Sequence, residues 1–462
     1  MSTPISQVQA WLEAHESEMV ASLRSMLQIA SIEGPAEPGA PFGRENREAL
    51  DLALNWCRDA GMATKDLDGY IGYGDFGQGK NLVAIFGHLD VVPVGPGWKH
   101  EPFGAEIDGD YLYARGATDD KGPSVAAFFA CRAIKECVPN LKSRIRMAFG
   151  CNEESGFKCI DKYAAEDEAP TYGFAPDAGW PLVYAEKGIG NLTVSRPLIE
   201  GEMALLGIKG GQRPNIVIDS CEASVRIAAT YRKEFEGKLS DAWDKNLSFV
   251  WEGDVLKIFA KGKAAHGAWP YGGDSAAARI LRFLMELAPV ASKHDYEVLF
   301  ETSHISGMGI GIHGSDEISE LTSNLGIVTT ENGRVRLLYN VRYPVTWTGD
   351  QLKAKCEKFL AKLPGGYALD VDRDSPPLYF PVDHPLTRTV LDAVEVETGE
   401  RGEPMVIGGG TYARAVPNTV AIGTGWQGDG EAHQTDERIK VAHVLRMAKI
   451  YARVILELSE LG

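Results

Sequence analysis

The sequence predicts an α/β protein built from two domains, one of which interrupts the other. The chain has 462 residues, more than a single hydrophobic core usually organises. Short apolar runs typical of buried strands, such as 81–86 and 144–149, end in polar residues and alternate with helical patterns. From about residue 190 to 376 the character of the chain changes, and α/β character then returns. We therefore expect one domain from 1–188 and 378–462, with an inserted domain at 189–377.

The individual elements follow from periodicity and turn signals. Apolar side chains at helical spacing predict one amphipathic helix over 6–29 and a second helix over 44–59. Asp108-Gly109-Asp110 predicts a hairpin turn. We expect further helices at the C-terminus and at 124–136, 160–168, 275–287 and 385–398, and further strands at 255–261, 336–343 and 420–423.

The composition is that of a soluble globular enzyme and argues against several kinds of partner. Hydrophobic residues make up 44% and charged residues 24% of the chain, and the formal net charge is −17. This charge disfavours nucleic acid and anionic membranes as partners, although solubility alone would explain it. The seven cysteines are odd in number and form no CxxC pair, so neither a disulfide framework nor a thiolate zinc site is indicated. With no signal peptide and no long apolar run, we expect a cytoplasmic protein.

The stretch Gly87-His88-Leu89-Asp90 follows the strand predicted at 81–86. Open α/β sheets bind their ligands beyond the carboxyl ends of the strands. His88 is therefore a candidate metal ligand, and Asp90 is a candidate partner that orients its imidazole. The alternative is a structural histidine in a capped loop, and this motif alone does not distinguish the two.

Two further segments carry adjacent acidic residues. Asp119 and Asp120 lie in a glycine-bounded turn before the helix expected at 124–136, where carboxylates can also simply complement the helix dipole. Glu153 and Glu154 follow the strand at 144–149, and adjacent glutamates repel each other unless a positive group compensates them. Such a pair suits a division of labour in which one carboxylate binds a metal ion and the other takes a proton from metal-bound water.

Two more residues complete a set of candidate metal ligands. Asp177 lies in a predicted loop at 174–179, and His433 lies in the stretch 430–437. Histidine and carboxylate ligands without thiolate suit zinc, and also manganese or cobalt. Five ligands are too many for one tetrahedral catalytic ion with an open position, and they fit two ions that share a carboxylate. The five candidates are His88, Asp119, Glu154, Asp177 and His433.

Three other features could contact a substrate. His266 lies between a predicted strand and a helix and could reach the neighbouring domain, although most lone histidines are structural. Arg342 lies in an apolar strand and is either an ordinary salt-bridged arginine or a clamp for a carboxylate. The turn Gly408-Gly409-Gly410 either satisfies backbone geometry or presents N–H groups to an anion.

Seven stretches in this order carry a resemblance to a known family: HLDVVP, ARGATDDKGP, NEESG, PDAGWPLVYAEKG, AAHGAWP, GGGTYAR and EAHQTDE. Together they resemble the di-zinc dipeptidases of the PepV and carnosinase type, which belong to a larger group with aminoacylase and carboxypeptidase G. The resemblance spans nearly the whole chain. It implies a two-domain metallopeptidase with a catalytic α/β domain, a mixed central sheet and an inserted α+β lid domain. It also implies hydrolysis of dipeptides with free termini by a water that bridges two divalent metal ions, most often zinc, with manganese or cobalt possible.

The resemblance further implies roles for the candidate ligands. His88 and Asp177 would bind one ion, and Glu154 and His433 would bind the other. Asp119 would bridge the ions, with Asp120 as the alternative bridge, and a cis peptide would follow the bridging residue.

Roles in catalysis and substrate binding are implied in the same way. Asp90 would orient His88, and Glu153 would be the general base. His266 would stabilise the oxyanion, and the C-terminal carboxylate of the substrate would be held by Arg342, Gly409 and Asn215.

The implied partner is a small peptide, and the implied form is a monomer whose large lid supplies its histidine in cis and closes on the catalytic domain. An N-acyl or N-succinyl amino acid deacylase on the same scaffold is the first alternative, because its substrates also carry a carboxylate. A catalytically inactive binding protein is disfavoured by the complete set of candidate residues. A two-metal phosphate-ester hydrolase would need clustered basic residues that the sequence lacks.

Overall fold

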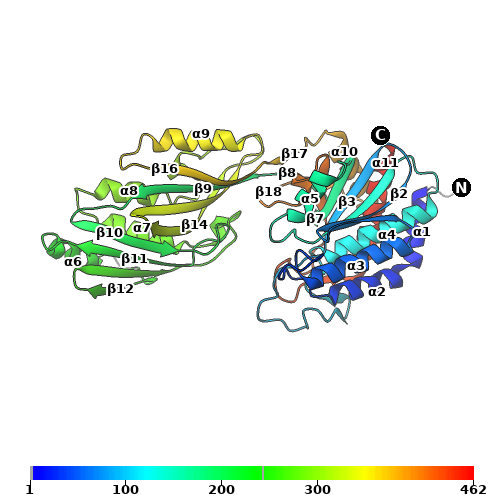
Figure 1. Ribbon diagram of the computed structural model, residues 1–462, viewed down its shortest axis with the longest axis horizontal. Coiled ribbons are helices and arrows are strands. Elements are labelled where there is room, and N and C mark those ends of the chain that lie inside the picture. Colours follow the sequence, from blue (N-terminus) through cyan, green and yellow to red (C-terminus); the bar gives the residue numbers. More distant parts are fainter. Residues whose placement is uncertain (1–3, 242–243, 462) are drawn as a thin grey trace. The chain divides into compact units, whose positions relative to one another are not determined.

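A computed structural model describes residues 4–241 and 244–461 of the chain, which divide into two compact units (Figure 1). Unit 1 comprises the described residues up to Tyr184, the segment Phe380–Met405 and the residues from Gly410 onward. Unit 2 comprises Ala185–Tyr379 and the short segment Val406–Gly409. The sequence-based division at 188 and 377 lies close to these bounds, but the assignment of Val406–Gly409 to unit 2 has no signal in the sequence.

Unit 1 is organised around a mixed sheet in the order β1-β2-β6-β3-β7-β19-β8. The four central strands β6, β3, β7 and β19 are parallel, whereas β1, β2 and β8 pair antiparallel with their neighbours. This arrangement confirms the mixed α/β class expected from the sequence. A small sheet, β20-β5-β4, contains the predicted hairpin at Asp108-Gly109-Asp110. The strands are β1 (Ala63–Leu67), β2 (Ile71–Gly77), β3 (Leu82–His88), β4 (Glu106–Asp108), β5 (Tyr111–Tyr113), β6 (Arg144–Gly150), β7 (Tyr172–Ala178), β8 (Leu182–Glu186), β19 (Thr419–Gly423) and β20 (Arg438–Lys440).

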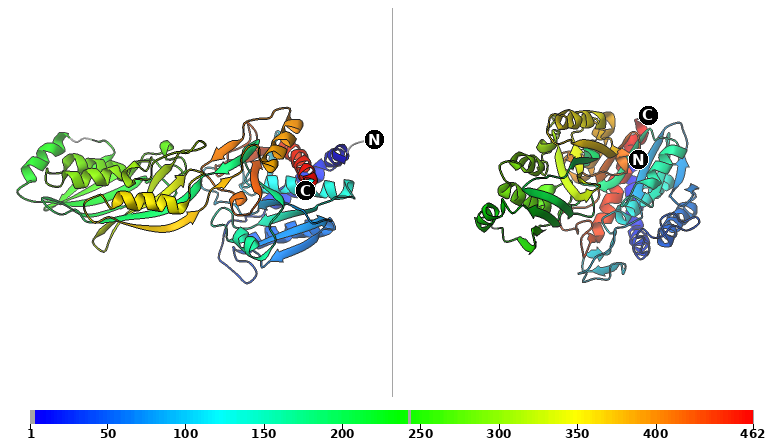
Figure 2. Two further views of the ribbon diagram at one scale, coloured as in Figure 1. Left: turned by 90° about the horizontal axis from the view of Figure 1, so that it is seen from above. Right: turned by 60° about the vertical axis from the view of Figure 1, so that its left-hand side comes forward.

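Helices cover both faces of this sheet. Trp56 of α3 packs against Phe128 of α4 on one face, where α11 also packs along α4 (Figure 2). On the opposite face, Tyr163 of α5 packs edge-on against Phe86 of β3. The helices of unit 1 are α1 (Pro4–Ala14), α2 (Glu16–Leu27), α3 (Arg44–Asp59), α4 (Lys121–Cys137), α5 (Lys158–Glu166), α10 (Pro385–Thr398), the 3-10 turn η3 (Tyr412–Arg414) and α11 (Val441–Glu460).

The prediction of one helix over 6–29 is wrong, because the helix breaks at His15 into α1 and α2. His15 leaves the helical region at φ −111° and ψ 14°, its ring stacks on Trp11, and its Nδ1 lies 2.7 Å from the Trp11 carbonyl oxygen. The buried residues Leu12 and Met19 lie on either side of the break and are seven positions apart, which is also the spacing of a continuous helix. The apolar pattern therefore hides the break.

Unit 2 contains one antiparallel sheet in the order β12-β13-β11-β10-β14-β15-β9-β16, with its own hydrophobic core. The helix α7 begins at the N-cap Ser275, whose side chain accepts a hydrogen bond from Ala278 N, and its buried face packs on β11 and β13. The strands are β9 (Gly188–Pro197), β10 (Met203–Gly210), β11 (Ser220–Ile227), β12 (Leu247–Glu252), β13 (Val255–Lys261), β14 (Thr322–Glu331), β15 (Arg334–Tyr343) and β16 (Ala368–Ser375). The helices are α6 (Arg232–Asp241), η1 (Pro270–Gly272), α7 (Ala276–Leu287), α8 (Lys293–Glu301), η2 (Met308–Ile310) and α9 (Gly349–Leu360).

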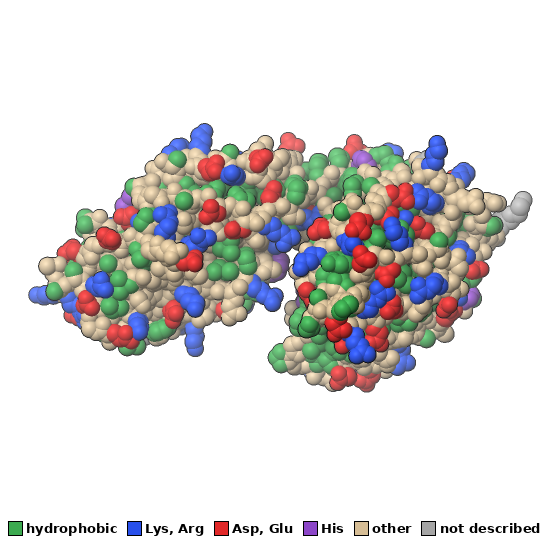
Figure 3. Space-filling model, in the orientation of Figure 1, with side chains coloured by type: hydrophobic (Ala, Val, Ile, Leu, Met, Phe, Trp, Pro, Cys, Tyr) green, Lys and Arg blue, Asp and Glu red, His purple; other side chains and the backbone are tan. Residues whose placement is uncertain are grey.

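Two short strands, β17 (Leu378–Tyr379) and β18 (Met405–Ile407), pair with β8 where the chain passes between the units. Acidic and basic side chains are interspersed on the face drawn in Figure 3. Within residues 4–241 and 244–461, none of the helices has both the length and the apolar character needed to cross a membrane.

Ile85 provides a test of the unit 1 core, since it lies fully buried in the central strand β3. We expect Ile85→Ala to lower the free energy of unfolding by about 2–5 kcal/mol, because it leaves a cavity in a rigidly packed sheet. Urea unfolding measures this change. The matched control is Val396→Ala on α10, which is 63% exposed and should change stability by no more than about 0.5 kcal/mol. Equal urea midpoints for Ile85→Ala and the wild type would contradict the assignment of β3 to the core.

Candidate active site

The carboxyl ends of three parallel strands bring most of the candidate residues together. His88 is the last residue of β3 and lies in register with Gly150, the last residue of β6. Glu153 and Glu154 follow β6 directly, and Asp177 comes from β7 on the other side of β3. Asp177 was expected in a loop but lies within β7, because that strand continues to Ala178 in parallel pairing with β19.

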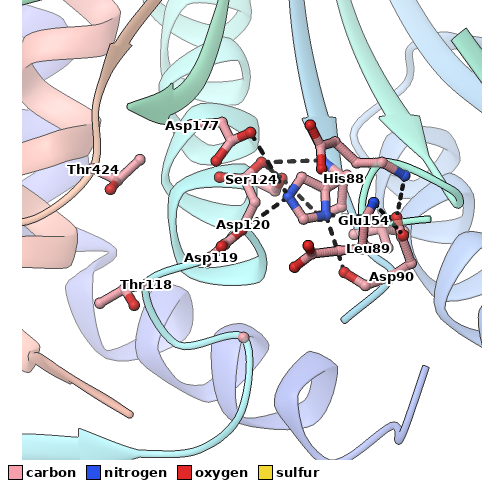
Figure 4. Close-up of polar contacts among 12 residues, drawn as sticks. His88, Leu89, Asp90, Thr118, Asp119, Asp120, Ser124, Glu154, Asp177 and Thr424 are labelled. Atoms are coloured by element: carbon pink, nitrogen blue, oxygen red, sulfur yellow. Dashed lines mark hydrogen bonds and ion pairs between the residues drawn. The ribbon is translucent and has the colours of Figure 1, made fainter. Parts of the chain in front are cut away.

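Asp119 lies between two histidines that are far apart in the sequence. Its Oδ1 is 3.0 Å from His88 Nε2, and its Oδ2 is 3.0 Å from His433 Nε2. His433 Nε2 also lies 2.9 Å from Glu154 Oε1, and His88 Nε2 lies 4.0 Å from Asp177 Oδ2. The five candidate ligands therefore form one cluster within unit 1, most of which is drawn in Figure 4.

Asp120 has different surroundings from Asp119, although the two are adjacent and joined by a cis peptide bond. Its side chain is fully buried, and its Oδ2 accepts hydrogen bonds from His88 N and Ser124 Oγ, both at 3.0 Å. Asp120 thus holds the main chain of β3 at the N-terminus of α4, whereas Asp119 lies beside His88 (Figure 4) and also contacts His433.

Asp90 connects the segment after β3 with the two glutamates. Its carboxylate accepts hydrogen bonds from Glu153 N and Glu154 N, each at 3.0 Å. His88 Nδ1 lies 3.0 Å from the Asp90 carbonyl oxygen and 3.5 Å from Asp90 Oδ1. Asp90 therefore fixes the orientation of the His88 ring and the main chain of both glutamates at once.

The crowding of carboxyl groups changes their proton affinities. Burial raises the pKa of Glu153 well above its usual value, and the nearby charges of Glu154 and Asp119 raise it further. Burial also raises the pKa of Glu154. It raises the pKa of Asp177 well above its usual value. For Asp119, burial is outweighed by hydrogen bonds with His433 and His88, which lower its pKa.

The two histidines respond in the opposite direction. Hydrogen bonds with Asp119 and then Glu154 raise the pKa of His433 to about 10. For His88, burial acts to lower the pKa, but hydrogen bonds with Asp119 and Asp90 outweigh it and hold the pKa well above its usual value. The buried carboxylates thus favour the protonated form of both histidines.

The donor set fits divalent cations. Ligand atoms of His88, Glu153 and Asp177 lie within 4.8 Å of one another, and so do those of His88, Asp119 and Glu154. Both groups combine imidazole nitrogen with carboxylate oxygen, as zinc, manganese and cobalt sites do. A cation would also relieve the repulsion among these neighbouring carboxylates.

The predicted substrate contacts lie together within unit 2; these are Asn215, His266, Arg342 and Gly409. Gly267 N donates to Asn215 O at 2.7 Å beside the bridge between Ile216 and His266, and Asn324 Nδ2 donates to the carbonyl oxygens of Pro214 and Ile216. Asn324 therefore fixes the turn that carries Asn215 next to the His266 loop.

Arg342 lies close to the same loop. It is buried in β15, donates from Nε to Asn340 Oδ1 at 3.0 Å, and donates from Nη1 to Gly408 O at 2.5 Å. Ala268 packs against Gly408, so the His266 loop, the turn before Gly409 and Arg342 are neighbours within unit 2.

Comparison with known proteins identifies the family. Residues 84–457 match the model of "Peptidase family M20/M25/M40". The chain belongs to this peptidase family. Relatives include "Putative dipeptidase YtjP" of Bacillus subtilis (strain 168), 34% identical over 460 residues that cover 96% of this chain and 98% of the relative. A "Putative dipeptidase" of Staphylococcus epidermidis is 33% identical over 462 residues, covering 96% and 97%.

Solved structures support the two-unit α/β fold. Human carnosine dipeptidase 1 has a TM-score of 0.59 at 15% identity, with 99% of both chains covered. The dipeptidase Dug1p of Saccharomyces cerevisiae has a TM-score of 0.56 at 15% identity, covering 100% of this chain and 99% of that one. These comparisons confirm the expected fold class and family and support metal-dependent hydrolysis of dipeptides.

Sequence reasoning missed two residues that contact the cluster. Tyr412 packs edge-on against the His88 ring, fits against Gly150 where any side chain would collide with it, and lies with its OH 2.9 Å from Cys159 Sγ. Glu437 receives hydrogen bonds from the segment that carries Asp119. Both residues belong to motifs noted in the sequence, GGGTYAR and EAHQTDE, but neither position carries a local signal of its contact.

The raised pKa of His433 predicts that metal binding releases protons. A group with a pKa of about 10 is protonated at pH 7, and its Nε2 must lose the proton before it can coordinate a cation. Apparent metal affinity should therefore fall as the pH is lowered. Calorimetric titration of metal-free protein with Zn²⁺ in two buffers of different ionisation enthalpy measures the proton release. His433→Ala is the control and should release fewer protons, while identical heats in both buffers for the wild type would refute the prediction.

Proposed function

We propose that the protein hydrolyses dipeptides with free N- and C-termini, using two divalent metal ions held by the cluster in unit 1. The observation that carries this proposal is Asp119, whose two oxygens lie 3.0 Å from His88 Nε2 and 3.0 Å from His433 Nε2. A carboxylate between two histidines is the arrangement expected of a ligand shared by two ions. The relatives carry the name "Putative dipeptidase", which supports the choice of substrate.

In this proposal the ligands divide between two sites. His88 and Asp177 hold one ion, Glu154 and His433 hold the other, and Asp119 is shared. We assign Asp119 rather than Asp120 as the shared ligand, because both oxygens of Asp119 face histidines whereas Asp120 Oδ2 accepts hydrogen bonds from His88 N and Ser124 Oγ. Zinc suits this donor set best, with manganese or cobalt as alternatives. When bound, the ions supply Lewis-acid activation of water and of the peptide carbonyl.

Glu153 is the proposed general base. Its main-chain N–H is held by Asp90, and its carboxylate belongs to the group that lies within 4.8 Å of His88 and Asp177. Neighbouring cations favour the ionised form of a buried carboxylate, which counters the raised pKa of the metal-free state. Glu153 then accepts a proton from the attacking water and transfers it to the leaving amine.

Unit 2 supplies the proposed substrate contacts. Arg342 is suited to a carboxylate because its planar guanidinium donates two parallel hydrogen bonds, and one of its nitrogens already bonds to the turn beside Gly409. Gly409 and Asn215 assist in holding the C-terminal carboxylate of the substrate. His266 donates to the oxyanion of the tetrahedral intermediate. We further propose a cytoplasmic monomer whose lid, unit 2, closes over the substrate.

The role of Glu153 is tested by Glu153→Gln. We expect kcat to fall by a factor of about 10²–10⁴, since the amide cannot accept the proton of the attacking water, while the metal content is retained. Steady-state kinetics and elemental analysis of the same preparation measure both effects. Glu154→Gln is the matched neighbour and should lose metal as well as activity. Near-normal turnover by Glu153→Gln would exclude it as the base.

The substrate class is tested with a hydrolysis panel of dipeptides, tripeptides and N-acetyl and N-succinyl amino acids. We expect cleavage of dipeptides alone. Arg342→Met should raise KM for dipeptides at least tenfold, because it removes a charge-assisted contact to the substrate carboxylate. Cleavage of N-acyl substrates alone would assign the protein as a deacylase on the same scaffold.

A further inference from the structure

We propose that Glu437 is a positioning residue that sets the separation of Asp119 and His433, and this inference rests on the proposed role of those two residues as metal ligands. Glu437 lies four residues after His433, and its side chain is completely buried. It belongs to the C-terminal part of unit 1, whereas Asp119 belongs to the N-terminal part. One carboxylate thus joins the two segments that carry the facing candidate ligands.

The carboxylate of Glu437 accepts hydrogen bonds from four residues of the segment 114–119, which we call the Asp119 segment. Its Oε1 accepts hydrogen bonds from Thr118 N at 2.8 Å, Thr118 Oγ1 at 3.0 Å and Asp119 N at 3.2 Å. Its Oε2 accepts from Arg115 Nη1 at 2.7 Å and Gly116 N at 3.1 Å. Three of the five donors are main-chain N–H groups, so Glu437 fixes the backbone from which the Asp119 side chain extends.

These five donors also exclude two other roles for Glu437. A carboxylate offers about four lone-pair sites, and here two oxygens receive five donors. No acceptor capacity is left for a metal ion or for a proton in transit. The side chain acts through the backbone that it holds, rather than by contact with a reacting group.

Residues of the Asp119 segment also bind the main chain of the segment that carries His433. Arg115 Nη1 donates to Gln434 O at 3.2 Å in addition to Glu437, and Ala114 N donates to Glu437 O at 3.1 Å. Arg115 and Glu437 therefore bind each other and connect the two segments. Both side chains are buried, which strengthens each hydrogen bond and makes the loss of any partner costly.

His433 needs such support because its backbone is in an unfavourable conformation. Its φ is +64° and that of Asp436 is +56°, values in the left-handed region that residues other than glycine rarely adopt. Such conformations persist only where the surrounding structure imposes them. Asp436 is held by Lys99 N and His100 N, which bond to its Oδ1, and Glu437 fixes the next position.

The contacts of His433 with Asp119 and Glu154 depend on the separation of the two segments. His433 Nε2 lies 3.0 Å from Asp119 Oδ2 and 2.9 Å from Glu154 Oε1, while the His433 side chain is half exposed and gains little support from packing. If Glu437 is removed, the Asp119 and His433 segments can separate, and the site that both residues share loses its geometry. Partners of this kind typically change metal affinity by 10–100-fold when they are mutated.

The experiment compares full-length Glu437→Gln, Glu437→Ala and Thr118→Val with the wild type. Metal-depleted protein is titrated with Co²⁺ and Zn²⁺ by calorimetry, and the visible spectrum of bound Co²⁺ reports the ligand geometry. The control is Asp167→Asn, a carboxylate that accepts from Lys65, Tyr73 and Arg146 in unit 1 and contacts none of the candidate ligands. It tests whether loss of a multiply bonded carboxylate is in itself enough to weaken metal binding.

We expect Glu437→Gln, which keeps one carbonyl oxygen, to weaken the binding of at least one ion by 10–100-fold and to change the Co²⁺ spectrum. Glu437→Ala should weaken it further, and Thr118→Val, which removes one of five donors, should weaken it severalfold. Asp167→Asn should lower the melting temperature with unchanged affinity and spectrum. If the Glu437 variants do not fold, Thr118→Val decides the question.

Wild-type affinities and spectra in the folded Glu437 and Thr118 variants would overturn the positioning role, and so would an equal loss of affinity in Asp167→Asn. A separate outcome concerns the proposed function. If the wild type binds two ions but cleaves no dipeptide, the substrate proposal fails while the affinity comparison still decides the role of Glu437.

Discussion

The contact of one carboxylate with two histidines is the interaction on which the candidate site depends. Asp119 faces both His88 and His433, and other acidic groups surround this trio in a buried cluster. Burial and like charge raise the pKa of Glu153 and Asp177, which disfavours the ionised forms of both carboxyls. Divalent cations favour the ionised forms of the same carboxyls. Protons and divalent cations therefore compete for one set of side chains.

Buried carboxylates outside the candidate ligand set hold the main chain of the ligand segments. Asp120 accepts from His88 N, Asp90 accepts from Glu153 N and Glu154 N, and Glu437 accepts from Asp119 N. Each ligand segment named here therefore has an N–H group fixed by an acceptor that is itself buried. Such hydrogen bonds convert the backbone into a rigid support, so the cluster keeps its geometry without relying on the packing of flexible side chains.

The fold class and the candidate residues could be predicted because they depend on local patterns. Apolar runs that end at His88 and Gly150 mark strand ends, and parallel neighbours bring those ends together. The contact between Glu437 and Asp119 could not be predicted, because it joins residues 318 positions apart and nothing near Glu437 signals it. The choice between Asp119 and Asp120 depends on which way two adjacent side chains point, a matter of backbone geometry that residue types do not specify. The break at His15 was hidden because helical spacing continues across it.

Unit 1 is assembled from distant parts of the chain, and this has a consequence for its biosynthesis. The strand β19 lies between β7 and β8 in the sheet, and α11 packs along α4, although hundreds of residues separate these elements. Until a ribosome has added β19, the facing edges of β7 and β8 are unpaired and offer sites for aggregation or chaperone binding. His433 follows β19 in the chain, so all five candidate ligands are present only after β19 has been synthesised. A nascent chain that ends before residue 433 therefore lacks one of the five proposed ligands, and the proposed metal cluster cannot form in it.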